Sequence, residues 1–195
     1  MRRVCVFCGA SSGRATAYAE SARAFGAAAA ARGIGIVYGG GRVGLMGSVA
    51  DGGLAAGAEV IGVIPQALVE RELAHGGLSQ LHVVGSLHER KALMAELADA
   101  FVALPGGFGT LDELMEQLTW SQLGLHAKPV GLLDVEEYWR PLVAFARHAT
   151  EEGFVREADL ASIAVAADAD SLLDQLARLE HEERPRPKWS KPPEP

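Results

Sequence analysis

Hydrophobic residues along the chain fall into seven short runs rich in Val and Ile, with longer helical stretches between them. The runs lie at residues 2–9, 33–40, 58–65, 81–86, 99–107, 128–135 and 162–168. Most are continuously apolar, which is typical of strands covered on both faces of a sheet. Helices are predicted at residues 16–32, 44–56, 88–98, 110–123, 136–152 and 171–182. This alternation predicts an α/β fold, a Rossmann-like doubly wound sheet of about seven mostly parallel strands with helices on both faces.

The length of 195 residues is that of one domain, which we expect to span residues 1–182. Residues 183–195 contain five prolines and no apolar periodicity, so they are predicted to form a disordered tail. Residues 66–77 lie between two predicted strands and are expected to form a loop or short helix that can fold over a site.

The chain has 18 Lys and Arg against 25 Asp and Glu, a formal net charge of -7. Such a surface repels phosphate backbones and anionic lipid, so neither nucleic acid nor a membrane is an expected partner. No apolar run approaches the length of about 18 residues that a membrane span needs. The composition therefore predicts a cytoplasmic protein.

Cys5 and Cys8 are the only two cysteines in the chain. In one extended strand their Cα atoms would lie about 10 Å apart, which is beyond disulfide reach. No second pair of Cys or His residues completes a structural zinc site. We expect both thiols to be buried as small hydrophobic groups and no metal to be bound.

A first glycine-rich turn, residues 38–48, joins a predicted strand to a predicted helix. Glycines there let a backbone approach a ligand closely, which makes Gly40 and Gly41 candidate contacts. The turn formally matches the dinucleotide pattern GxGxxG, but that pattern also needs an acidic residue at the end of the next strand. Glu59 lies at the beginning of that strand, which disfavours a dehydrogenase. Glycines that merely permit close helix packing remain the alternative.

A second glycine-rich turn follows the strand at residues 99–107 and precedes a helix predicted to begin at Thr110. Gly106, Gly107 and Gly109 free the backbone to direct N–H groups toward one point. The helix N-terminus adds about half a positive charge there. This turn is therefore the predicted anion site, and a phosphate group fits it.

Thr110 and Glu113 have the T-x-x-E spacing of a capping box, in which the carboxylate would bond the N-cap amide. Spacing alone leaves both this role and a catalytic role open for Glu113. Asp112 and Glu116 are interpreted as first-turn acids that the helix dipole favours.

Arg90 and Lys91 lie at the start of another predicted helix, where cations oppose the dipole. A bound phosphate or an acidic neighbour would compensate them, and a solvated cluster that includes Glu89 is the alternative. His88 indicates no metal site, because the other histidines are scattered along the chain.

Two blocks resemble a known family. The sequence PGGFGTLDE fits the signature PGGxGTxxE, and HERK followed by ALMAELADAFVALPGG is similar to the LOG family of cytokinin-activating phosphoribohydrolases. Further similar blocks are CVFCGASSG, GIGIVYGGGRVGLMGSVADGGLAAGAEVIGVIP and LTWSQLGLHAKPVGLL, so the likeness spans residues 4–180. One departure is Leu87, where the family pattern has Met.

The resemblance implies a Rossmann-like homodimer that needs no cofactor. It implies hydrolysis of the N-glycosidic bond of purine riboside 5'-monophosphates, either N6-substituted AMP or AMP, to free base and ribose 5-phosphate. Arg90 and Glu113 match the family's catalytic pair. Its nucleotide contacts match Glu72, Lys91, Gly107, Phe108, Gly109, Thr110, Leu111, Asp112 and Thr119.

The chemistry of these residues is compatible with that assignment. Cleavage of a glycosidic bond builds positive charge on the sugar, which the carboxylate of Glu113 can stabilise. Arg90 can hold phosphate or ribose oxygens with a planar set of donors.

Two other classes of protein remain as alternatives. The first is a nucleotide carrier or sensor without turnover, against which Arg90 and Glu113 together argue. The second is a pyridoxal phosphate decarboxylase, for which Lys91 and Lys128 are the candidate Schiff-base residues within the domain. Neither lysine lies in the motif expected for that cofactor.

Overall fold

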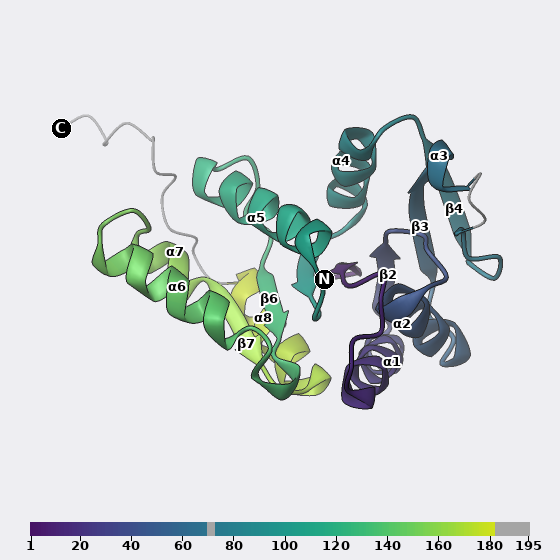
Figure 1. The fold of residues 1–195 in the computed structure, drawn as a ribbon, viewed down its shortest axis with the longest axis horizontal. Helices are drawn as coiled ribbons and strands as arrows, with labels where there is room; N and C mark the ends of the chain where they lie inside the picture. The colour runs from purple at the N-terminus through teal and green to yellow at the C-terminus, as the bar shows by residue number, and fades with distance from the viewer. Residues whose placement is uncertain (70–72, 182–195) are drawn as a thin grey trace.

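The computed structural model describes residues 1–69 and 73–181. Seven strands form one sheet in the order β4-β3-β2-β1-β5-β6-β7, with every neighbouring pair parallel (Figure 1). The strands are β1 (Arg3–Phe7), β2 (Gly35–Tyr38), β3 (Val60–Pro65), β4 (Gln80–Val84), β5 (Ala100–Ala103), β6 (Val130–Leu133) and β7 (Ile163–Ala166). Each overlaps one predicted run, so the predicted doubly wound parallel sheet is confirmed.

Both faces of the central strands are buried, which explains their continuous apolar sequence. In β1, Val4 and Val6 belong to the core on one face, whereas Cys5 and Phe7 belong to the core on the other. Side chains alternate across a strand, so a strand between two cores is apolar at every position. Cys5 and Cys8 are buried and free, as predicted.

The helices cover the two faces in separate groups (Figure 1). α1 (Thr16–Ala31), α2 (Gly44–Ala55) and α8 (Ala169–His181) supply residues to the first core, and α4 (Leu87–Leu97) and α5 (Phe108–Leu123) supply residues to the second. α1 and α2 pack with little space between their backbones. A Cβ at Gly26 would lie 2.3 Å from the Val49 carbonyl oxygen, and one at Gly52 would lie 2.2 Å from that of Arg23.

Two regions differ from the prediction. The helix predicted at residues 136–152 is divided into a 3-10 turn, η1 (Val135–Glu137), and α6 (Arg140–Glu151). Glu136 and Glu137, within η1, have positive φ angles that a continuous right-handed helix does not allow, and Pro141 favours a new helix start. α3 (Gln66–Val69) occupies part of the predicted loop or short helix at residues 66–77, and α7 (Glu157–Ala161) was not predicted.

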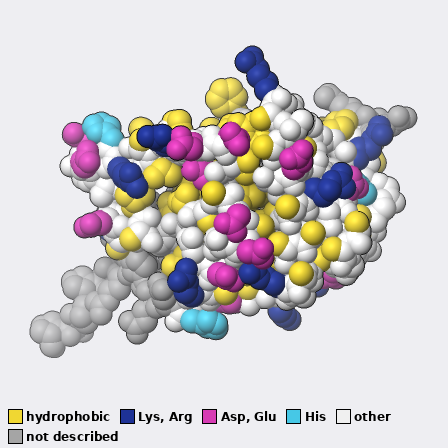
Figure 2. All heavy atoms as spheres, turned by 90° about the horizontal axis from the view of Figure 1, so that it is seen from below, with side chains coloured by type: hydrophobic (Ala, Val, Ile, Leu, Met, Phe, Trp, Pro, Cys, Tyr) yellow, Lys and Arg dark blue, Asp and Glu magenta, His cyan; other side chains and the backbone are white. Residues whose placement is uncertain are grey.

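Residues 70–72 and 182–195 are not described, so Glu72 and the predicted tail at 183–195 lie outside the described residues. Among the helices that are described, none is long and apolar enough to cross a membrane. On the face shown in Figure 2, the described acidic and basic side chains are interspersed. This face therefore offers no continuous basic surface for a polyanion.

Candidate active site

A cavity of about 580 Å³ opens at the carboxyl ends of β1, β2 and β5. Its walls come mainly from the turns after these strands, with further side chains from α1, α3, α4 and the segment before α6. Strands β1 to β4 follow one another toward one edge of the sheet, and the next strand in the chain, β5, lies on the other side of β1. The turns after β1 and β5 therefore diverge, and such a switch point is where doubly wound sheets bind ligands.

The turns around the cavity are joined by backbone contacts. The Gly9 N–H donates to the Pro105 carbonyl at 3.0 Å, and the Leu45 N–H donates to the Gly9 carbonyl at 3.0 Å. Gly44 has a φ of +59°, and a Cβ there would lie 2.5 Å from the Ala10 carbonyl oxygen. Close packing thus explains part of the first glycine cluster, which was one of its two interpretations.

The guanidinium of Arg90 is fixed on the cavity wall by three neighbours. Its Nε donates to the Val63 carbonyl at 3.1 Å, and its Nη1 lies 3.3 Å from Oε1 of Glu113. Gly39 leaves the space for it, since a Cβ at Gly39 would lie 1.8 Å from Nη2 of Arg90. Arg90 from α4 and Glu113 from α5 therefore meet as a pair, and both line the cavity.

The carboxyl group of Glu113 is poised to exchange a proton near neutral pH. The residue is only 8% exposed, and this burial raises its pKa to about 7, although the charge of Arg90 acts in the opposite direction. Such a shift in a cavity is typical of a group that works in acid-base or electrostatic catalysis.

The start of α5 differs from the prediction. The helix begins at Phe108 with Gly107 as its N-cap, and no side chain caps it. Thr110 is thus already inside the helix, so the predicted capping box of Thr110 and Glu113 is wrong. The reason is the extended conformation of Gly107, with φ -97° and ψ -153°, which allows the helix to begin directly after it. Glu113 is free of capping and turns toward Arg90.

Backbone amides at this helix start are available to a ligand. The N–H groups of residues 107–110 donate to no other residue in the described part of the chain, and Leu111 makes the first bond, to the Gly107 carbonyl at 3.1 Å. Unpaired amides and the positive end of the helix dipole together favour an anion.

Side-chain capping is found instead on α4, whose N-cap is Ser86. The Ser86 Oγ accepts from the Glu89 N–H at 3.1 Å, and Oε2 of Glu89 accepts from the Gly85 N–H at 2.8 Å. These bonds begin α4 at Leu87 and place Arg90 in its first turn.

Lys91, the neighbour of Arg90, does not line the cavity. Its Nζ lies 3.0 Å from Oδ2 of Asp112 and 3.0 Å from Oε1 of Glu116. Both cations at the start of α4 are therefore compensated by carboxylates of α5, the acidic neighbours that were one of the open alternatives. Asp112 and Glu116 lie beyond the first turn of α5, so their interpretation as first-turn acids is wrong.

The structure brings part of the predicted site together. Besides Arg90 and Glu113, the cavity is lined by Gly41, Gly106, Gly107, Gly109 and Thr110. The predicted contacts that do not line it are Gly40, Lys91, Phe108, Leu111, Asp112 and Thr119. Helical geometry explains several of these, because successive residues point about 100° apart and cannot all face one cavity. Phe108 is 92% exposed, and Thr119 lines a separate groove between α5 and α6.

Sequence reasoning missed several residues of the cavity. They are Cys8, Tyr18, Gly39, Met46, Leu68, Leu73 and Tyr138. Most follow the carboxyl ends of strands, and that position was the one signal for them, since parallel strands place their following turns at one edge of the sheet. Gly39 and Met46 lie in the glycine-rich turn at residues 38–48, which the sequence marked as a whole, whereas nothing in the residue types marks the others.

Comparison with known proteins adds to this picture. A family model described as "Possible lysine decarboxylase" matches residues 46–176. The chain is 50% identical to the cytokinin riboside 5'-monophosphate phosphoribohydrolase of Rhodococcoides fascians over 173 residues, 88% of this chain and 87% of that protein. It is 47% identical to the Arabidopsis thaliana protein of the same name, LOG7, over 181 residues, 93% of this chain and 83% of that one.

Solved structures share the fold at lower identity. The molybdenum cofactor carrier protein of Chlamydomonas reinhardtii superposes with a TM-score of 0.70 at 22% identity, covering 92% of this chain and 98% of that one. At this identity the match shows the Rossmann-like fold alone. The family model and the curated relatives carry the stronger conclusion, which is that this chain belongs to the LOG family.

Proposed function

We propose that this protein hydrolyses the N-glycosidic bond of purine riboside 5'-monophosphates, releasing the free base and ribose 5-phosphate. The observation that carries the proposal is the Arg90–Glu113 pair, which lies in one cavity with the unpaired amides at the start of α5. The relatives named as phosphoribohydrolases, at 47% to 50% identity, support the same activity.

In this proposal the phosphate of the nucleotide occupies the N-terminus of α5. The amides of residues 107–110 would donate to its oxygens, and the helix dipole would attract its charge. A Cβ added at Gly107 or at Gly109 would have no neighbouring atom within 4 Å, so the ligand can approach the backbone from that side.

The ribose then lies beside the Arg90–Glu113 pair. As the bond from the base nitrogen to C1' breaks, positive charge develops on the sugar, and the Glu113 carboxylate stabilises it. Water attacks C1' and transfers a proton to Glu113, the departing nitrogen takes up a proton from solvent water, and Glu113 later returns its proton to solvent, so that one water is consumed in all. Arg90 orients the carboxylate and can hold ribose or phosphate oxygens.

The base faces the apolar part of the cavity. Met46, Ile64, Leu68 and Leu73 line the cavity and belong to α2, β3, α3 and the segment after α3 rather than to the glycine turn of α5. Such a surface suits a purine ring and an N6-prenyl group alike. We propose both N6-prenyl-AMP and AMP as substrates, with no cofactor.

The alternatives fit the site less well. A decarboxylase would need a Schiff-base lysine in the cavity, but no lysine lines it within the described residues. Lys91 is paired with two carboxylates, and Nζ of Lys128 donates to the Ala95 carbonyl at 2.6 Å. A nucleotide carrier remains the second candidate, because carrier proteins share the fold.

The decisive experiment incubates the protein with AMP, isopentenyl-AMP, GMP and CMP and measures released base by chromatography. We expect release of adenine or isopentenyladenine, with little from CMP. Binding of AMP without release of base would support a carrier and contradict the hydrolase. Release of carbon dioxide from lysine with added pyridoxal phosphate would support the decarboxylase.

The rate should depend on pH through Glu113. Because burial raises its pKa to about 7, the carboxyl is neutral below that pH and cannot stabilise a cation. We expect kcat/KM for AMP, which reports the pKa of the free enzyme, to rise with pH and to reach half its plateau near pH 7. A kcat/KM that is unchanged from about pH 6 to about pH 8 would contradict the role of this carboxylate.

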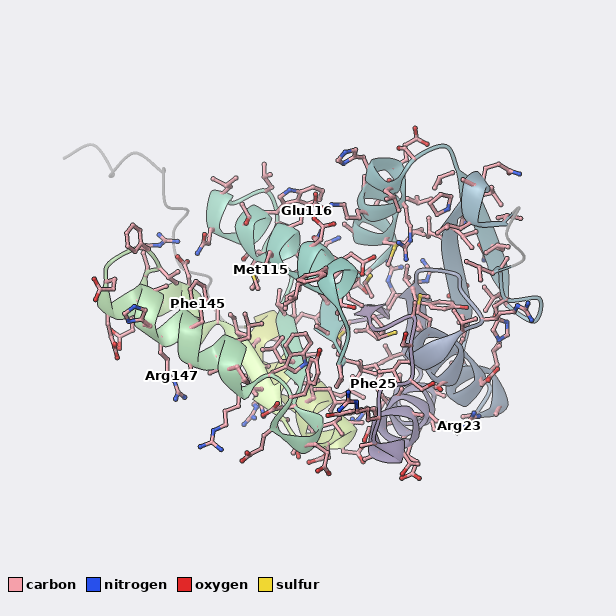
Figure 3. All side chains as sticks on the ribbon, viewed as in Figure 1. Arg23, Phe25, Met115, Glu116, Phe145 and Arg147 are labelled. Atoms are coloured by element: carbon pink, nitrogen blue, oxygen red, sulfur yellow. The ribbon has the colours of Figure 1, made fainter. Side chains whose placement is uncertain are left out.

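We also propose that the protein is a homodimer, with its interface at the groove between α5 and α6. The groove measures about 510 Å³, and α6 has no buried residue although Leu142, Val143 and Phe145 face the groove. Met115 projects from α5 and Phe145 from α6, the helices that border it (Figure 3). Phe145 is 66% exposed, and a second copy of this chain would cover it.

Replacing Phe145 by Glu is expected to convert a dimer to a monomer, because a carboxylate cannot be buried in an apolar interface without a partner. Light scattering after size exclusion measures the mass. Phe154→Glu is the matched control, since Phe154 is 77% exposed but does not line the groove. An unchanged dimer mass for Phe145→Glu would exclude this surface as the interface.

We further propose a cytoplasmic location. It rests on the composition and on the two buried free thiols, which suit a reducing compartment.

A further inference from the structure

The segment before α6 has an unusual backbone. Glu136 and Glu137 have φ angles of 53° and 56°, and within the described residues they are the only non-glycine positions with positive φ. Each such residue costs about 1 kcal/mol or more, and two in succession persist only where neighbouring contacts hold them. The contacts that hold this turn lead to the cavity.

Two side chains after the turn bind the turn that follows β5. The Trp139 indole donates from Nε1 to the Ala103 carbonyl at 3.2 Å, and the Tyr138 hydroxyl donates to the Gly106 carbonyl. Oδ1 of Asp134 accepts a hydrogen bond from the Trp139 N–H at 2.6 Å, which joins the beginning of the segment to its end. Through these two side-chain hydrogen bonds, the segment after β6 stabilises the glycine turn before α5.

The Tyr138 hydroxyl bonds the carbonyl of the Gly106–Gly107 peptide, and the N–H of this same peptide is one of the amides of the proposed phosphate site. In a trans peptide the carbonyl and the following N–H point in opposite directions, so holding the Gly106 oxygen fixes the direction of the Gly107 N–H. The preceding carbonyl, of Pro105, is already held by the Gly9 N–H. Without the Tyr138 bond, a Gly-Gly peptide with many accessible conformations would have to be ordered by the ligand.

We propose that Tyr138 is a positioning residue for phosphate binding: its hydroxyl holds the Gly106–Gly107 peptide in the orientation that presents the amides of α5 to the 5'-phosphate. This inference rests on the proposed function for the identity of the ligand. The ring of Tyr138 has contacts of its own that do not involve the hydroxyl. It packs edge-on against Tyr18 and Trp139, with centroid distances of 5.9 Å and 5.0 Å.

Tyr138→Phe tests the proposal because it removes the hydroxyl and keeps the ring. We expect the KM for AMP to rise about fivefold, with kcat within about twofold of wild type, as follows from the loss of one hydrogen bond that orders the site. Calorimetry should show the same loss of affinity for AMP, measured in the Glu113→Gln background to prevent turnover. Affinity for adenosine, which lacks the phosphate, should not change.

Glu137→Gly is the matched control in the same segment. It removes the left-handed strain and keeps the Tyr138 hydroxyl, so we expect unchanged AMP affinity and a Tm higher by about 2–4 °C. Unchanged AMP affinity in Tyr138→Phe would overturn the proposal. An equal loss for AMP and adenosine would overturn it as well, because Tyr138 would then act as a wall of the cavity.

The calorimetric measurement also separates this inference from the proposed function. If the wild-type protein binds AMP without releasing adenine, the hydrolase proposal fails. The comparison of AMP with adenosine still decides whether Tyr138 orders the phosphate site.

Discussion

Glu113→Gln is expected to lower kcat for AMP by at least about 100-fold while leaving AMP affinity close to that of wild type. Gln has the same shape and keeps an amide oxygen in place of the carboxylate oxygen that lies 3.3 Å from Nη1 of Arg90. What it lacks is the negative charge that stabilises the developing cation and the basicity that accepts a proton from water. The measurement is kcat by release of adenine, together with AMP binding by calorimetry.

The structure removes a confounding effect on stability that the sequence suggested for this substitution. A capping residue would lose about 1 kcal/mol of stability on substitution, but Glu113 caps nothing. A buried carboxyl whose pKa is raised by desolvation is also replaced by a neutral amide at little cost. We therefore expect a melting temperature near that of wild type. Wild-type turnover in Glu113→Gln would exclude Glu113 from the chemistry.

Gly39→Ala is expected to lower kcat/KM for AMP by about 100-fold without unfolding the protein, because it displaces a catalytic group by more than an ångström. The added Cβ would lie 1.8 Å from Nη2 of Arg90 and 3.3 Å from Sδ of Met46. Both are the far ends of flexible side chains, and the φ of Gly39 is not in the left-handed region. The backbone can therefore remain in place while the guanidinium leaves its position between Val63 and Glu113.

A double-mutant cycle with Arg90→Ala identifies the cause. Arg90→Ala should weaken both AMP binding and rate, and adding Gly39→Ala to it should have little further effect, since the displaced group is already absent. Additive losses would show that Gly39 acts independently of Arg90. Gly76→Ala serves as the control, because no atom lies within 4 Å of a Cβ at Gly76 and it does not line the cavity.

The fold was largely predictable because its signals are local and repeated. Continuous apolar runs in β1 and β5 indicate strands buried on both faces, and their alternation with helices selects a parallel sheet. The helix boundaries were less predictable. The start of α5 depends on the conformation of Gly107, and the break before α6 depends on two left-handed glutamates that tertiary contacts hold in place.

The sequence alone indicated the class of fold, a glycine turn before a helix as the predicted anion site, and the family whose motif contains Arg90 and Glu113. Charge and helix position without the family resemblance could not separate Arg90 from Lys91, which are adjacent and both cationic. The tertiary structure separates them, since neighbouring residues of a helix point about 100° apart. One cation enters the cavity beside Glu113 and the other is held by Asp112 and Glu116 on the surface of α5. The roles of Gly39 and Tyr138 were equally hidden, because each depends on a neighbour that is distant in the chain and meets it only when the strands are in register.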